Sequence, residues 1–164
     1  MTGSNIPLFA LPGPAWRWAV QAIRSQGRRV MTEDKQSTLE VRGLEFRAQH
    51  PLDGWPIAGS GFELPFLEAY TEKEILSNII PDGFRYSYGA RLLNYRGINQ
   101  IDAIIATLKR NPSSRRAVAI TYDPARDIGQ ESIPCLQLAD FLIRGDELHG
   151  GILIEYLGRV APDI

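Results

Sequence analysis

The sequence predicts an α+β fold, because helical and strand patterns are mixed without a regular βαβ alternation. Two segments, residues 14–27 and 98–109, carry apolar side chains at the i, i+3, i+4, i+7 spacing of an amphipathic helix. Three further segments have the composition of strands: residues 118–122, 134–143 and 148–156. A polar turn separates the last two, which predicts a hairpin.

The first helix is expected to begin at Pro14 and to end at Gly27, where a glycine cap follows the last apolar residue. The residues on its apolar face are Trp16, Ala19, Val20 and Ile23. The polar run at residues 32–37 predicts a loop. Residues 39–41 and 44–48 both alternate, but out of phase by one residue, and Gly43 lies at the slip. This pattern is typical of a β-bulge within one strand.

A loop rich in proline and glycine is predicted for residues 51–61, followed by a helix over about 65–80. Thr71 and Glu74 have the spacing of a capping box that would restart this helix. The helix over 98–109 is expected to end before Asn111-Pro112. Its inward residues are Ile101, Ile104, Ile105 and Leu108.

The 164-residue length favours one domain spanning 1–164. The net charge is -1, which argues against a nucleic-acid partner, and no apolar run approaches the ~20 residues of a membrane span. The amino terminus lacks signal-peptide features, and the lone Cys135 favours a reducing compartment, so a cytoplasmic protein is expected. His50 and His149 match no zinc spacing, and no metal is expected.

Several residues could carry chemistry. Cys135 is either a buried small hydrophobe or a nucleophile whose thiolate a nearby cation stabilises. Arg115 and Arg116 follow a Pro-Ser-Ser turn and are either a solvated strand end or a phosphate clamp. The segment 86–89 is an aromatic cluster beside a glycine turn, and Asn99-Gln100 could cap a helix.

The order and spacing of these residues resemble the thymidylate synthase family, and within it the compact branch whose relatives include dCMP hydroxymethylases. The resemblance covers about residues 16–148. The motifs that carry it are Gly27-x-x-Val30, Thr38-Leu39-Glu40, Tyr88-Gly89-x-Arg91, Gln100, Pro112-x-Ser114-Arg115-Arg116 and Pro134-Cys135. It implies a large mixed sheet with helices on one side, which pairs back to back with the sheet of a second subunit.

The resemblance also implies chemistry. The thiolate of Cys135 would add to C6 of a pyrimidine nucleotide, and C5 would attack the one-carbon unit of the co-substrate 5,10-methylenetetrahydrofolate. Tyr88 matches a tyrosine of the proton-transfer network. Arg115 and Arg116 match arginines that reach the partner subunit's nucleotide phosphate, and Gln137 falls among the substrate-binding positions.

This sequence departs from the family pattern at four places. Leu136 stands where many members carry histidine, and residues 33–35 replace an expected phosphate-capping arginine. The helix around residues 68–74 is short, and the family's folate-side general base could be one of three glutamates or none of them. These are Glu68, Glu72 and Glu74. After the hairpin the family's Arg-Ser-x-Asp is missing, and Glu155 stands near the position of its arginine. Arg159 is a candidate to replace that arginine in part, without a motif that supports it, and this end is expected to be truncated or divergent.

The leading functional hypothesis is methylation of dUMP to dTMP by a homodimer. The alternatives are dCMP hydroxymethylation and a non-catalytic homodimer that binds pyrimidine nucleotides.

Overall fold

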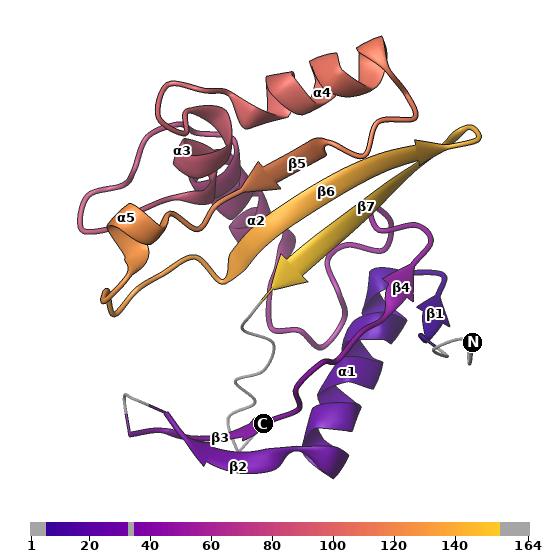
Figure 1. The fold of residues 1–164 in the computed structure, drawn as a ribbon. Helices are drawn as coiled ribbons and strands as arrows, with labels where there is room; N and C mark the ends of the chain where they lie inside the picture. The colour runs from indigo at the N-terminus through magenta and orange to yellow at the C-terminus, as the bar shows by residue number, and fades with distance from the viewer. Residues whose placement is uncertain (1–5, 33–34, 155–164) are drawn as a thin grey trace. The chain divides into compact units, whose positions relative to one another are not determined.

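The computed structural model describes residues 6–32 and 35–154, and the predicted α+β class is confirmed (Figure 1). The chain divides into two compact units, one containing residues 1–64 and one formed by residues 65–155, and each is described by itself. The expectation of a single domain stays a prediction. Three interpretations made from the sequence lie outside the described residues: those on Glu33 and Asp34, on Glu155, and on Arg159.

The first unit combines one long helix with two small pairs of strands. Strand β1 (Leu8–Phe9) pairs in parallel with β4 (Arg47–Ala48). Strand β2 (Arg28–Met31) pairs antiparallel with β3 (Ser37–Glu40). Helix α1 (Pro12–Gln26) buries mainly small side chains. Three aromatic rings with centroids 5.7 to 6.4 Å apart form a cluster in this unit: Phe9, Trp18 and Phe46.

Two local predictions in this unit differ from the structure. Helix α1 does end before Gly27, but that residue is extended, with φ -64° and ψ 141°, instead of left-handed. The predicted bulge at Gly43 is wrong: β3 ends at Glu40, and Gly43 lies in a turn with φ +69°, a conformation that glycine adopts without strain. The two out-of-phase patterns belong to two strands that pair with different neighbours, and not to one bulged strand.

The second unit is a three-stranded antiparallel sheet with helices (Figure 1). The sheet order is β5-β6-β7, so neighbours in sequence are neighbours in the sheet. Its elements are α2 (Leu64–Tyr70), the π-helix η1 (Thr71–Ile75), α3 (Tyr88–Leu93), α4 (Gln100–Arg110), β5 (Ala117–Ile120), α5 (Pro124–Asp127), β6 (Leu136–Arg144) and β7 (Glu147–Ile154).

The helix predicted for residues 65–80 is shorter and has no restart. Tyr70 has α-helical dihedrals and passes directly into η1, which ends at Ile75, so the capping box at Thr71 and Glu74 is wrong. Helices α3 and α5 were not predicted, because six and four residues are too few to show a helical period. Among the described residues, the helices lack the combination of length and apolar composition that crossing a membrane requires.

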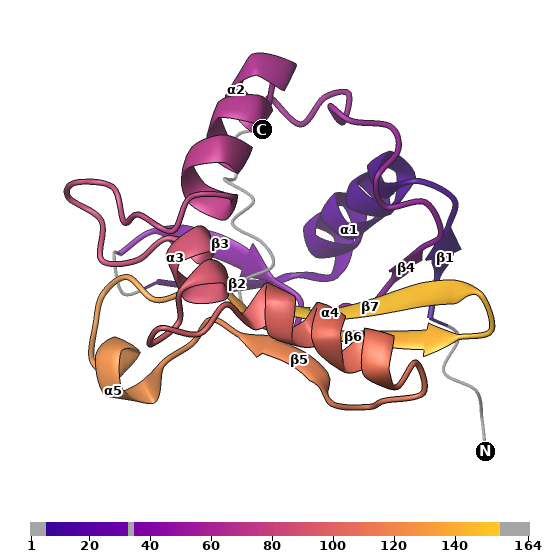
Figure 2. The ribbon, with the colours of Figure 1, turned by 90° about the horizontal axis from the view of Figure 1, so that it is seen from above.

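Helix α4 lies along one face of the sheet (Figure 2). Ile104 and Leu108 pack against Ala117 and Ala119, which are almost fully buried. Ile105, expected to face inward, is 44% exposed. The small alanines let the helix approach β5 closely, so only a narrow stripe of α4 is covered.

The glycine of the Tyr88-Gly89 motif is required by close packing. A Cβ at Gly89 would lie 2.0 Å from the carbonyl oxygen of Ser77 and 2.8 Å from that of Ile75. We expect Gly89→Ala to lower the free energy of unfolding by about 2–4 kcal/mol, since main chain on both sides must shift. Thermal or denaturant unfolding measures this. Gly13→Ala is the control, because its Cβ would meet nothing closer than 3.7 Å, and an equal loss in both variants would contradict the steric explanation.

Candidate active site

Cys135 lies directly before β6, after the buried Pro134, and it is exposed. The interpretation of this residue as a buried hydrophobe is therefore wrong. The chain beside it is anchored to Thr121, whose hydroxyl donates to the carbonyl of Leu136 and whose amide donates to the carbonyl of Gln137 at 3.0 Å. The pairing of β6 with β7 shifts register between Leu136 and Leu138. The bulge of this sheet thus follows the cysteine, where a bulge can re-aim neighbouring side chains.

Two tyrosine hydroxyls bind the main chain on either side of Cys135. The Tyr86 hydroxyl donates to the carbonyl of Ile133 at 3.0 Å, and the Tyr88 hydroxyl accepts from the amide of Leu136 at 3.4 Å. The two rings meet edge to face, with centroids 5.7 Å apart. Tyr88, predicted from the sequence, is therefore next to the cysteine, and Tyr86 joins it.

A third tyrosine, Tyr70, is electrostatically coupled to Tyr88 and Cys135. Burial raises the pKa of Tyr86 far above its ordinary value, and the charges of Tyr88 and Cys135 add to the increase. Burial likewise raises the pKa of Tyr70, with further contributions from Tyr88, Glu74 and Cys135. Both phenols therefore stay protonated at neutral pH. Sequence reasoning missed Tyr70, because nothing in a helix-forming segment marked it.

Of the three glutamates considered as a general base, Glu74 is half-buried in η1, while Glu68 and Glu72 are exposed. Glu74 is also close enough to Tyr70 for its charge to raise that pKa. Short π-helical segments recur at functional sites, since they change the direction of a side chain within a helix.

Arg91 connects this group to the loop that leads to the cysteine. Its guanidinium carbon lies 5.9 Å from the centroid of the Tyr86 ring, and its Nη2 donates to Asp127 at 2.6 Å. Arg91, Asp123 and Asp127 are all buried. Burial alone would raise the pKa of Asp123, but bonds from Arg96 and the Ala125 amide, with the charges of Arg96 and Arg91, hold it below its ordinary value.

The side chain of Gln100 forms hydrogen bonds to main-chain groups of two other segments. Its Nε2 donates to the carbonyls of Arg91 (2.8 Å) and Ile120 (2.7 Å), and its Oε1 accepts from the Ile120 amide at 3.0 Å. The neighbouring Asn99 caps α4, as predicted, by accepting from the amides of residues 101 and 102. Gln100 thus joins α3, α4 and the free edge of β5.

Arg115 and Arg116 lie at the opposite end of the sheet from Cys135. Both are exposed, directly before β5, and Ala117 pairs with Phe141, six residues along from the cysteine. At ~3.3 Å per residue the separation is roughly 20 Å. Gln137 is half-buried, two residues after the cysteine. The structure thus brings Cys135, Tyr88 and Gln137 together within one chain and leaves the two arginines apart from them.

Comparison with known proteins identifies the family of this segment. The sequence model of the thymidylate synthase family matches residues 65–154, which is more than half of the chain and nearly all of the second unit. A solved thymidylate synthase from T4 phage aligns with 38% of this chain and 22% of its own, at 27% identity and a TM-score of 0.35.

Archaeal relatives extend the match toward the amino terminus. Proteins whose names mark them as provisional thymidylate synthases are 34% identical in Methanosarcina barkeri, 35% in Methanopyrus kandleri and 33% in Methanocaldococcus jannaschii. The alignments cover 82%, 82% and 85% of this chain and 62%, 65% and 66% of the relatives. The chain therefore spans about two thirds of the length of these proteins. With the family match over the whole segment that holds Tyr88, Arg116 and Cys135, the chain belongs to the thymidylate synthase family.

Proposed function

We propose that this chain forms a methyltransferase that converts dUMP to dTMP with 5,10-methylenetetrahydrofolate through a covalent bond to Cys135. The observation that carries the proposal is an exposed thiol within the family segment, with the main chain on both sides of it bound by tyrosine hydroxyls. An exposed cysteine is available for attack, and a thiolate is the most nucleophilic group that a neutral-pH protein offers.

The reaction balances as follows. The Sγ thiolate adds to C6 of the pyrimidine, and the electron pair moves to C5, which attacks the one-carbon unit. C5 then loses its proton, the folate leaves from the one-carbon unit, and hydride from the folate completes the methyl group. The Cys135 bond breaks at C6, and dTMP and dihydrofolate are released. The Tyr88 hydroxyl is proposed to relay the C5 proton, and Gln137 to contact the nucleotide.

The separation of the arginines from Cys135 supports a homodimer in which Arg115 and Arg116 bind the nucleotide phosphate in the partner's site. A span of roughly 20 Å is too long for one nucleotide to bridge them within a chain. The sheet face opposite α4 also presents apolar side chains: Val118 is 41% exposed, Ile120 39% and Leu153 56%. A second copy packed on this face would cover that surface.

The proposal is tested with 5-fluoro-dUMP, whose C5 carries no proton to lose. With methylenetetrahydrofolate it should leave a stable adduct, seen as an added mass that peptide mapping places on Cys135. Cys135→Ser should show no added mass. A native protein that forms no adduct at saturating ligands, although iodoacetamide alkylates Cys135, would overturn the proposal. An adduct with 5-fluoro-dCMP alone would favour the hydroxymethylase alternative.

A prediction concerns Tyr86 as a positioning residue. Tyr86→Phe removes the hydrogen bond to the Ile133 carbonyl and leaves the rings packed. Losing it should raise the barrier by about 1–2 kcal/mol, or roughly 5–30-fold in the rate of adduct formation at saturating ligands. KM should change less than twofold, because no ligand contact is removed. Tyr95→Phe, on the neighbouring loop, is the control; a Tyr86→Phe variant with an unchanged rate and a raised KM would contradict the positioning role.

A further inference from the structure

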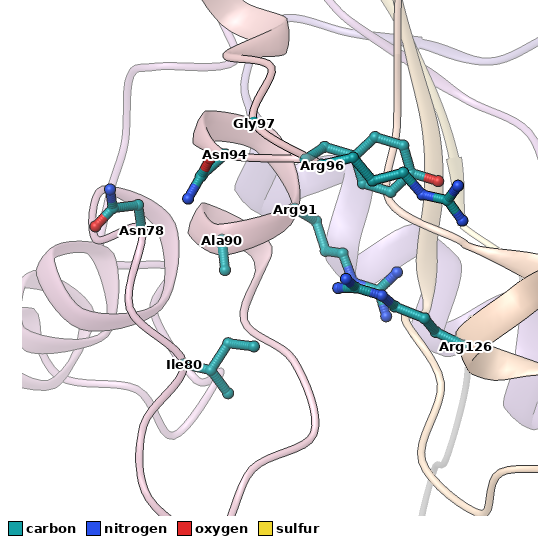
Figure 3. A pocket seen from close by; sticks show the side chains of 9 residues that line it. Asn78, Ile80, Ala90, Arg91, Asn94, Arg96, Gly97 and Arg126 are labelled. Carbon is teal, nitrogen blue, oxygen red and sulfur yellow. The ribbon is translucent and has the colours of Figure 1, made fainter.

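A cavity of about 320 Å³ lies in the second unit, lined by α3, by the segments before and after it, and by Arg126 of α5. Its lining includes the polar residues Asn78, Asn94, Arg91, Arg96 and Arg126 (Figure 3), together with Tyr95. Cys135, Tyr86 and Tyr88 do not line it, but Arg91, which packs against the Tyr86 ring, does, so the cavity adjoins the candidate active site. Its volume is at the lower end of the ~300–1,000 Å³ of small-molecule sites, which limits an occupant to a small molecule or group.

The cavity carries an excess of positive charge. Three arginines line it, and the carboxylates that pair with them are Asp123 and Asp127. Arg91 pairs with Asp127, while Arg96 and Arg126 share Asp123 at 3.0 and 3.6 Å. Three cations against two anions leave one positive charge, and Figure 3 shows Arg91 and Arg126 pointing toward each other from α3 and α5. Asp123 and Asp127 compensate two of the three positive charges, and the remaining charge attracts a further anion.

One donor in this cluster is unsatisfied. Arg91 is 4% exposed, and its Nη1 is buried without a hydrogen-bond acceptor among the described residues. The Asp123 Oδ2 lies 3.9 Å away, close enough for charge attraction but too far for a hydrogen bond. A buried N–H of a charged group without an acceptor is costly. This N–H is not exposed to the neighbouring cavity, but Arg91 lines that cavity, so a rotation of the guanidinium would bring it to an acceptor oxygen held there.

We infer that this cavity binds a small oxyanion, a phosphate or carboxylate group, through Arg91, Arg126 and Arg96. Guanidinium groups donate pairs of parallel N–H bonds that match the oxygen spacing of both groups. Asn78 and Asn94 also line the cavity, away from the guanidinium groups of Arg91 and Arg126 (Figure 3). This site is independent of the nucleotide phosphate contacts proposed for Arg115 and Arg116.

The experiment is a calorimetric titration of the full chain with inorganic phosphate and, separately, with citrate, each at constant ionic strength set by chloride. Arg126→Gln and Arg96→Gln test the cavity, because both side chains are more than half exposed. Arg96 also donates to the buried Asp123, so the unfolding midpoint of Arg96→Gln is measured beside its affinity. Arg110→Gln, at the exposed end of α4, is the matched control. An Arg115→Gln, Arg116→Gln double variant removes the other predicted phosphate contacts.

We expect Arg126→Gln to weaken the binding of phosphate, citrate or both by about tenfold. The Arg110→Gln and double variants should retain this Arg126-dependent binding. Binding of phosphate alone identifies a phosphate group, and binding of citrate alone a carboxylate. Failure of both anions to bind, or affinities that Arg126→Gln and Arg96→Gln leave unchanged, would overturn the inference. Neither result bears on the Cys135 adduct, so this inference and the proposed function fail separately.

Discussion

An equal mixture of two inactive variants should recover about a quarter of the native activity. Cys135→Ser lacks the proposed nucleophile, and the Arg115→Ala, Arg116→Ala double variant lacks the proposed phosphate contacts. When subunits reassociate at random, half of the dimers are mixed, and each mixed dimer holds one site with an intact cysteine and intact partner arginines. Half of the dimers therefore have one complete site out of two, so one quarter of all sites are active.

The size of the effect follows from the arginines. Each charge-assisted hydrogen bond to phosphate is worth ~1.5–3 kcal/mol, so one arginine changes dUMP affinity by roughly 10–150-fold. The double variant is therefore inactive at dUMP concentrations near the native KM. Activity of the separate and mixed variants is followed by the folate absorbance change. If the arginines served their own chain's site, no mixed dimer would hold a complete site and the mixture would stay inactive.

Removal of the Arg91 side chain should cause the largest loss of stability. Arg91→Met leaves the buried Asp127 without its 2.6 Å partner, and breaking a buried pair from one side costs about 3–5 kcal/mol. The midpoint of denaturant unfolding should fall accordingly. Because an apolar replacement of both partners is often neutral, Arg91→Met combined with Asp127→Leu should recover part of the loss.

Arg126→Ala is the matched single-arginine control, since that side chain is 59% exposed and its 3.6 Å contact with Asp123 is worth less than ~1 kcal/mol. Equal destabilisation by Arg91→Met and Arg126→Ala would show that burial of the pair does not determine its contribution.

The sequence predicted the elements whose pattern is long enough to show a period. The helix over 98–109 is confirmed as α4, and the hairpin over 134–156 as β6 and β7. On β5 the larger Val118 is exposed, and the small Ala117 and Ala119 are buried. Hydrophobicity alone would place the larger Val118 on the buried face. The close approach of α4, which favours the small alanines there, is a tertiary effect that the local pattern does not contain.

The sequence indicates the candidate site only through the order and spacing of its motifs. Tyr88 and Cys135 are 47 residues apart in the chain, and the contact between the Tyr88 hydroxyl and Leu136 has no local signal. Arg91 belongs to the Tyr88-Gly89 motif, but its pairing with Asp127, 36 residues later, comes from the tertiary fold. Tyr70 carried no motif at all. Long-range pairs of this kind follow from how α3 and α5 pack, and no spacing rule predicts them.

The hydrogen bonds on both sides of Cys135 have a consequence for conformational entropy. Fixing the main chain of one residue costs ~1–2 kcal/mol, and the three residues between the Ile133 carbonyl and the Gln137 amide are already ordered by Tyr86, Tyr88 and Thr121. Roughly 3–6 kcal/mol of ordering is thus complete when the chain folds, before any ligand arrives. The geometry of the thiol is a property of folding, so a substitution that loosens α3 slows the reaction even when every contact to the ligand is intact.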